Sequence, residues 1–132
     1  MAGQVVLFAE EDTLFRLMET ALNRTVSPKA EKALHYFFGE DISKPIDYLK
    51  SLQSSLGLPV DIKGVVCEQE EKLEEFLKDA DFLVVERPPI TREMLKKCHG
   101  RLKLVQKFGS DYKEIDIVAA KEMSIPVCKL LR

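Results

Sequence analysis

In the second half of the chain, short apolar runs alternate with amphipathic segments. The apolar runs occupy residues 82–85, 102–105 and 125–128, and the apolar residues between them have helical spacing. This pattern predicts strand, helix, strand, helix and strand, which is typical of a parallel sheet. Because crossover connections join parallel strands, the loops after their carboxyl ends line one common edge. We expect any functional site to lie at that edge.

The first half begins with a continuous apolar run at residues 5–9, which predicts a central strand buried on both faces. The run stops at three consecutive acids, Glu10, Glu11 and Asp12. Asp12 or Thr13 is suited to cap a following helix. The apolar stripe predicted for this helix consists of Leu14, Met18 and Leu22.

Residues 27–58 predict a pair of helices inserted after the first helix. Ser27 followed by proline is typical of a helix start, and Gly39 of its end. The second helix is expected to end at Gly57. Its apolar stripe consists of Ile46, Leu49, Leu52 and Leu56. The aromatic cluster at residues 35–38 favours a place in the core or in a subunit contact over a ligand site.

The run at residues 60–66 begins with alternating apolar and charged residues, which predicts an edge strand. The helix after it is expected to face the sheet through Leu73, Phe76 and Leu77. Together these segments predict an α/β fold with five parallel strands in the order 2-1-3-4-5, in one domain over residues 1–132.

Composition restricts the environment and the partners of the chain. With 132 residues, it has the length of one domain that buries a core without disulfides or metal. A net charge of −2, with acids and bases interleaved, argues against a nucleic acid or an anionic membrane as a partner. The three cysteines are scattered and the amino terminus has no signal-peptide pattern, so we expect the cytoplasm.

Four segments of the second half follow one another in a characteristic order. They are Asp-Ala-Asp-Phe-Leu-Val-Val at 79–85, Pro-Ile-Thr-Arg-Glu-Met-Leu at 89–95, Arg-Leu-Lys-Leu-Val-Gln-Lys-Phe-Gly at 101–109, and Ile-Asp-Ile-Val-Ala-Ala-Lys-Glu at 115–122 with Ile-Pro-Val-Cys at 125–128. This order resembles the amino-terminal substrate domain of the D-isomer-specific 2-hydroxyacid dehydrogenases, such as the phosphoglycerate dehydrogenases. The resemblance implies a flavodoxin-like, three-layer domain that closes over a nicotinamide-binding domain and helps to hold a small 2-hydroxy or 2-oxo acid. It also implies NAD or NADP as the cofactor of a complete enzyme.

The chain lacks the sequence features of a dinucleotide site. Its six glycines never form a G-x-G pair, so no cofactor-binding residue is assigned. By the resemblance, the family's catalytic arginine, glutamate and histidine follow the matched residues, and neither His35 nor His99 has a matching context. We therefore assign no catalytic residue and expect no hydride transfer by this chain alone. Cys98 and His99 have no second ligand pair, so no metal site is assigned.

Two loops of this domain face the cofactor cleft in the family, and the resemblance assigns substrate contacts to both. Arg87 and Pro88 follow the third strand, where a guanidinium suits a substrate carboxylate or phosphate and proline stiffens the loop. The second loop follows the fourth strand, where backbone amides are expected to bind the carboxylate. Its assigned residues are Lys107, Phe108, Gly109 and Ser110. Asp111 stands where the family usually has a second glycine, and its carboxylate repels an anion if it points into the cleft.

The match stops where the linker to the family's nicotinamide domain would begin. We therefore interpret the chain as a substrate domain truncated before that domain. Apolar surface left bare by the missing segments is expected to form a homodimer, or to be covered by the helices of residues 27–58.

A second reading has the same fold and a different function. Residues 5–22 also resemble the start of a response-regulator receiver, in which acids after the first strand bind magnesium. The acids of residues 10–12 would supply that pair, with Glu86 at the position of the phosphorylated aspartate and Lys129 near the invariant lysine. Because glutamate is not the usual phosphate acceptor, this reading implies a degenerate receiver that acts through protein contacts.

Overall fold

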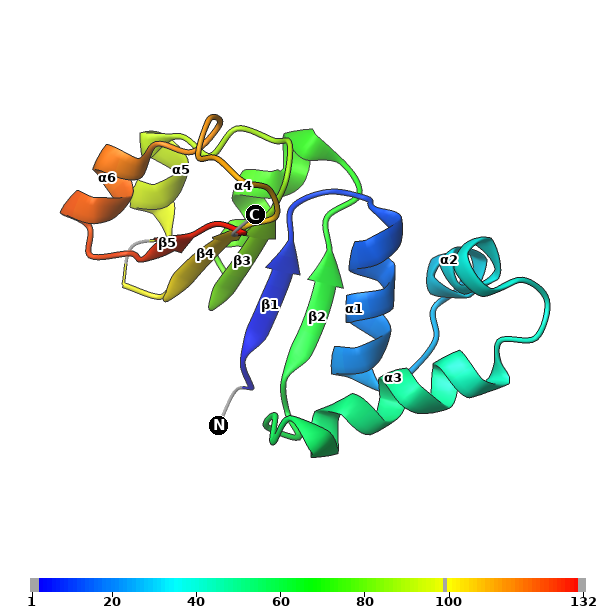
Figure 1. Cartoon of the computed structure of the whole chain (residues 1–132). Helices are drawn as coiled ribbons and strands as arrows, with labels where there is room; N and C mark the ends of the chain where they lie inside the picture. Colours follow the sequence, from blue (N-terminus) through cyan, green and yellow to red (C-terminus); the bar gives the residue numbers. More distant parts are fainter. Residues whose placement is uncertain (1–2, 99, 131–132) are drawn as a thin grey trace.

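A computed structural model describes residues 3–98 and 100–130 of the chain (Figure 1). The strands are β1 (Val5–Phe8), β2 (Lys63–Val66), β3 (Phe82–Val85), β4 (Leu104–Lys107) and β5 (Val127–Cys128). The α-helices are α1 (Thr13–Asn23), α2 (Pro28–Phe38), α3 (Ser43–Ser55), α4 (Leu73–Leu77), α5 (Arg92–Lys97) and α6 (Ile117–Glu122). A short 3₁₀ helix, Glu70–Lys72, precedes α4.

The five strands form one parallel sheet in the order β2-β1-β3-β4-β5, which confirms the predicted α/β fold. Val6 of β1 pairs with Gly64 on one side and with Phe82 on the other. A side chain at position 64 would crowd α1, because a Cβ there would lie 3.2 Å from Cδ1 of Leu22. The carboxyl ends of the strands share one edge, where the candidate site was predicted.

Three strand starts differ from the prediction. Residues 60 and 61 form a turn before β2, and Val60 is 86% exposed, so its alternation with charged residues does not mark a strand face. β4 and β5 each begin two residues later than predicted. Leu102 and Ile125 are buried, but their amides still donate to carbonyls of Cys98 and Ala120 at the preceding helix ends.

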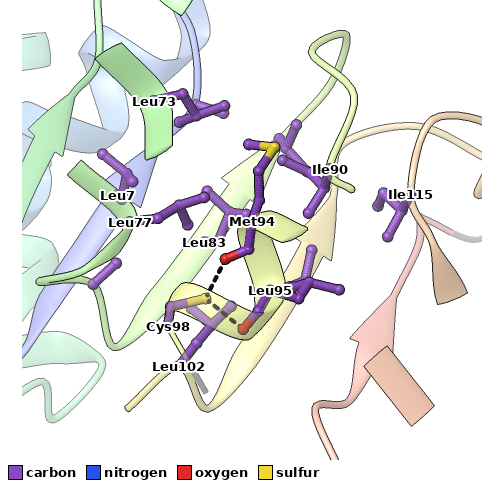
Figure 2. Packing of buried hydrophobic residues seen from close by; sticks show 14 of the residues in the cluster. Leu7, Leu73, Leu77, Leu83, Ile90, Met94, Leu95, Cys98, Leu102 and Ile115 are labelled. Atoms are coloured by element: carbon purple, nitrogen blue, oxygen red, sulfur yellow. Dashed lines mark hydrogen bonds between the residues drawn. The ribbon is translucent and has the colours of Figure 1, made fainter. Parts of the chain in front are cut away.

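The main core fills the face of the sheet that α4, α5 and α6 cover (Figure 2). Its members include Leu7, Leu73, Leu77, Leu83, Ile90, Met94, Leu95 and Ile115. A smaller cluster lies on the opposite face beneath α1 and contains Phe8, Phe15 and Val66. Helices therefore lie on both faces of the sheet, and on the α1 side they cover the part formed by β1 and β2.

Two helices bury a different face from the predicted one. Leu14 is 40% exposed, whereas its neighbour Phe15 is fully buried with its ring 5.3 Å from that of Phe8. The large Phe15 ring sets the rotation of α1, and the rest of the predicted stripe is half-buried. Phe76 is 38% exposed because the five-residue α4 buries only its first and last residues.

The inserted helices α2 and α3 pack on α1, on the side away from β4 and β5 (Figure 1). The predicted start of α2 is confirmed, since the Ser27 hydroxyl accepts the amide hydrogen of Ala30 at 3.1 Å. Gly39 ends the helix with φ of 81°. In α3 the predicted apolar residues Ile46, Leu49 and Leu52 are half-buried, and the residue that is buried is Gln53. Leu56 is 66% exposed, because α3 ends at Ser55.

The aromatic residues of α2 do not enter the core. Tyr36, Phe37 and Phe38 are all exposed, so the prediction of a core position is wrong, while that of a subunit contact stays a prediction. The insertion also does not cover the part of the sheet that carries Phe82 and Leu104, which stay half-buried.

Candidate functional site

At the carboxyl edge of the sheet, the carboxylate of Glu10 organises the loop that follows β3. The side chain of Glu10 is 10% exposed and accepts the backbone N–H of Glu86 at 2.7 Å and that of Arg87 at 3.1 Å. Nε of Arg87 donates to the same carboxylate at 3.0 Å. The loop after β1 thus holds the loop after β3 in place.

The guanidinium of Arg87 remains at the surface while it pairs with Glu10. Its side chain is 67% exposed, and the hydrogen bond to Glu10 raises the pKa of the guanidinium above its usual value. Pro88 is buried behind it. Arg87 therefore stays a permanent cation at the predicted edge.

A cavity of about 380 Å³ opens beside Arg87. Its lining consists of Ala9, Glu10, Glu11, Cys67, Glu68, Glu70, Arg87 and Pro88. Four of these side chains are acids, so the cavity itself is unsuited to an anion.

The ammonium group of Lys107 has two hydrogen-bond partners within the domain. Its side chain is 6% exposed, and Nζ donates to Oε2 of Glu114 at 2.8 Å and to the backbone carbonyl of Glu86. These bonds connect the loops after β3 and β4. A Cβ at position 109 would lie 3.2 Å from Cε of Lys107, so Gly109 leaves room for the lysine stem.

The loop after β4 does not use a positive φ that would require glycine. The positive φ angles among the described residues occur at Arg24, Ser124 and three other glycines, and neither Gly109 nor Asp111 has one. Aspartate at position 111 therefore causes no backbone strain. Its carboxylate accepts the N–H of Lys113 at 3.0 Å, within its own loop.

The loop after β4 presents unpaired backbone donors. The Phe108 N–H is used by the sheet, donating to Val85 at 2.7 Å, and the Phe108 ring packs edge-on against Phe15. In the part of the chain that the structure describes, no protein acceptor binds the N–H groups of Gly109, Ser110 or Asp111. Such groups are the ones that bind a carboxylate.

The remaining acids of the first loop have structural partners. Asp12 caps α1 by accepting the N–H of Leu14 at 2.8 Å, and Glu11 binds Nε of Arg16 at 2.8 Å. Across residues 3–98 and 100–130, no group of three or more His, Cys, Asp or Glu side chains is placed to hold a metal ion. His99 lies outside this description. Lys129 places its ammonium 5.2 Å from the ring centre of Tyr112.

The role of Glu10 was missed by the sequence reasoning, which considered it only among the acids of residues 10–12 that a receiver would use to bind magnesium. A carboxylate placed directly after a central strand lies near the end of the next strand in the sheet, so its position relative to the strand was the available signal. The burial of Lys107 was also missed, although every second residue of β4 faces the core.

The fold agrees with comparisons to known proteins. The model of the D-isomer specific 2-hydroxyacid dehydrogenase catalytic domain matches residues 43–130. This segment is two thirds of the chain and includes both loops of the site. The chain belongs to this family.

Solved structures of dehydrogenases share the fold. NAD⁺-bound 3-phosphoglycerate dehydrogenase of Entamoeba histolytica is 19% identical with a TM-score of 0.57, over 97% of this chain and 33% of that protein. NAD-dependent formate dehydrogenase of Staphylococcus aureus, in complex with NAD, is 18% identical with a TM-score of 0.55, over 97% and 31%. The chain thus spans about one third of their length. A search of curated proteins found no significant match. No described helix is long and apolar enough to cross a membrane.

Proposed function

We propose that this chain is the substrate-binding domain of an NAD(P)-dependent D-2-hydroxyacid dehydrogenase, and that it holds a small 2-hydroxy or 2-oxo acid at the carboxyl edge of its sheet. The observation that carries this proposal is the loop after β4. Its unpaired amides, residues 109–111, lie within the family match and are tied through Lys107 to the loop that bears Arg87.

The two loops have complementary roles in this proposal. The N–H groups of Gly109 and Ser110 donate to the substrate carboxylate, and Arg87 supplies a positive charge at the mouth of the site. Lys107 and Phe108 support the loop from inside the domain through an ion pair and a ring contact. Pro88 limits the motion of the arginine loop.

Hydride transfer requires a nicotinamide-binding domain as well. The sequence has no G-x-G fingerprint, so the chain is proposed to bind neither NAD nor NADP and to be inactive alone. Residues 1–132 form one domain in this proposal, with 27–58 as its helical insertion. The free cysteines Cys67, Cys98 and Cys128 support the cytoplasm as its compartment.

Titration of the ¹⁵N-labelled chain with D-lactate, followed by amide chemical shifts, tests the proposal. We expect saturable shifts at Gly109, Ser110 and Asp111, and weaker binding of acetate, which lacks the 2-hydroxyl. Arg87→Ala is expected to weaken D-lactate binding about tenfold, because a charge-assisted hydrogen bond is lost.

The matched control is Arg101→Ala, which removes an exposed arginine near Asp81 at the opposite edge of the sheet. It should leave D-lactate binding unchanged. Shifts that are absent from residues 109–111, or an equal loss in both variants, would contradict the proposed site.

A further inference from the structure

The segment that leaves β5 lies against the loop after β4. The N–H of Leu130 donates to the carbonyl of Gly109 at 2.9 Å. Two further contacts join the same segments. The Tyr112 hydroxyl donates to the carbonyl of Val127 at 3.4 Å, and the ammonium of Lys129 lies 5.2 Å from the centre of the Tyr112 ring. The loop is therefore held from the side of β5.

The hydrogen bond from Leu130 is not part of the regular ladder between β4 and β5. In that ladder Val105 is paired with Val127. A parallel ladder continued at this register would direct the N–H of Leu130 to the carbonyl of Lys107. Leu130 instead reaches Gly109, two residues further along the chain. The bond therefore fixes the loop and does not extend the sheet.

The bond at Gly109 also sets the direction of the next amide. The carbonyl of Gly109 and the N–H of Ser110 belong to one planar trans peptide, in which they point in opposite directions. Because Leu130 holds the carbonyl, the N–H of Ser110 points away from Leu130. The strand order places β3, and with it the loop that bears Arg87, on the other side of β4 from β5.

The N–H of Ser110 is available to a ligand in this orientation. Ser110 is exposed, and within the described part of the chain no protein acceptor binds its N–H. An amide with a fixed direction is preorganised for an anion, because little orientational freedom is lost on binding. A half-turn of the same peptide would present the carbonyl oxygen of Gly109, whose partial negative charge repels a carboxylate.

We propose that the backbone N–H of Leu130 is a positioning group for the substrate carboxylate. It holds the peptide between Gly109 and Ser110 so that the Ser110 N–H donates to the ligand. This inference rests on the proposed function and adds to it a residue outside both site loops. Leu130 does not touch the ligand, and its side chain has no part in the effect.

Replacing a single N–H group tests this role. Cys128 allows residues 128–132 to be joined as a synthetic peptide to residues 1–127 by ligation at the cysteine. In that peptide the nitrogen of Leu130 is replaced by an ester oxygen, which removes the donor and keeps the side chain. The matched control is the ligated chain with the normal amide.

Two quantities are compared in chains labelled with ¹⁵N in residues 1–127. The residual dipolar coupling of the Ser110 N–H reports its direction in the domain, and titration with D-lactate reports affinity. The ester should change this coupling while the couplings of β1 and β3 remain. It should also weaken D-lactate binding about tenfold, because the carboxylate loses a charge-assisted hydrogen bond.

Two variants separate this bond from the general attachment of the loop. Leu130→Ala keeps the N–H, and Tyr112→Phe removes the longer hydrogen bond to the segment after β4's neighbour, β5. Both variants should leave the Ser110 coupling and the affinity for D-lactate unchanged.

Three results would overturn the inference while the control chain still binds D-lactate. They are an unchanged Ser110 coupling in the ester chain, a changed coupling with unchanged affinity, and an equal loss of affinity in Tyr112→Phe. A control chain that does not bind D-lactate would instead refute the proposed function, and this inference with it.

Discussion

The two faces of the sheet are covered by helices of different chemistry. Beneath α4, α5 and α6 the buried residues are nearly all apolar, with Leu83, Val85 and Leu95 fully buried and Lys107 buried at the carboxyl end of β4. Beneath α1 the buried apolar cluster is smaller, consisting of Phe8, Phe15 and Val66, and the helix also buries Arg16 and Thr20. The first face depends on apolar area removed from water, whereas the second depends on polar partners in the right places.

A charge network replaces the missing apolar area on the α1 side. Arg16 is 5% exposed and donates through Nε and Nη2 to Glu11 at 2.8 and 2.5 Å, and through Nη1 to Glu19 at 3.0 Å. Lys29 at the start of α2 binds Glu68 in the loop after β2. The network joins α1, α2 and the loop after β2 through contacts that the pattern of apolar residues does not predict.

The largest loss of stability is expected on the apolar face. Leu83→Ala removes a fully buried side chain from β3 and leaves a cavity, so the free energy of unfolding should fall by about 3 kcal/mol. Urea unfolding measures the change. Val118→Ala, at an exposed site on α6, is its control and should change stability by less than about 0.5 kcal/mol. A Leu83→Ala value near that of the control would mean that this face is loosely packed.

A smaller loss is expected from the charge network. Arg16→Ala leaves two carboxylates without their shared partner and should cost about 2 kcal/mol. Arg92→Ala removes a more exposed arginine, paired with Glu122, and should cost clearly less than Arg16→Ala, because solvent screens the pair. Urea unfolding of both variants gives the comparison. Equal losses of stability in the two variants would show that burial does not strengthen the ion pairs of Arg16.

The α1 side should also be the more sensitive to acid. The hydrogen bond from Arg16 lowers the pKa of Glu11 below its ordinary value of 4.5. Since the folded-state pKa is lower than the unfolded one, the stabilisation is complete above about pH 4.5 and is lost as the pH falls through the folded-state value. Glu11→Gln should therefore be less stable than the wild type at neutral pH and approach it in acid. A difference that is constant across urea titrations at several pH values would contradict this.

The smallest effect is expected at the site loop. Asp111 is exposed and its carboxylate binds within its own loop, so Asp111→Gly should leave stability nearly unchanged. Removing one negative charge beside the unpaired amides should tighten D-lactate binding about two- to threefold. The amide titration of the wild type serves as the reference. Unchanged affinity would show that this carboxylate does not act on the bound anion.

Sequence reasoning succeeded where a short pattern of apolar residues directly reflects the burial of the same residues. The apolar runs identified all five strands, and their connections predicted the order β2-β1-β3-β4-β5. The positions of the two site loops followed, because each loop begins where an apolar run stops. The starts of β4 and β5 moved by two residues, because apolar residues at helix ends are also buried, and the start of β2 moved by three, because the exposed Val60 lies in a turn.

Sequence reasoning failed where the environment depends on distant partners. Arg16 is buried because Glu11 and Glu19 surround it, which no hydrophobic pattern reveals. Glu10 and Arg87 are 77 residues apart, and only the neighbouring positions of β1 and β3 bring them together. Lys107 is likewise buried on account of Glu114 and of a carbonyl in the adjacent loop.

The sequence by itself determined the class of fold, the family and the sheet edge that carries the two candidate loops, because periodic burial and short motifs are local properties of a chain. The tertiary structure decided which charges are paired, which side chains of α1 face the core and which amides of the candidate loop remain free. These depend on through-space contacts between segments far apart in the sequence, and such contacts exist only after the sheet has assembled.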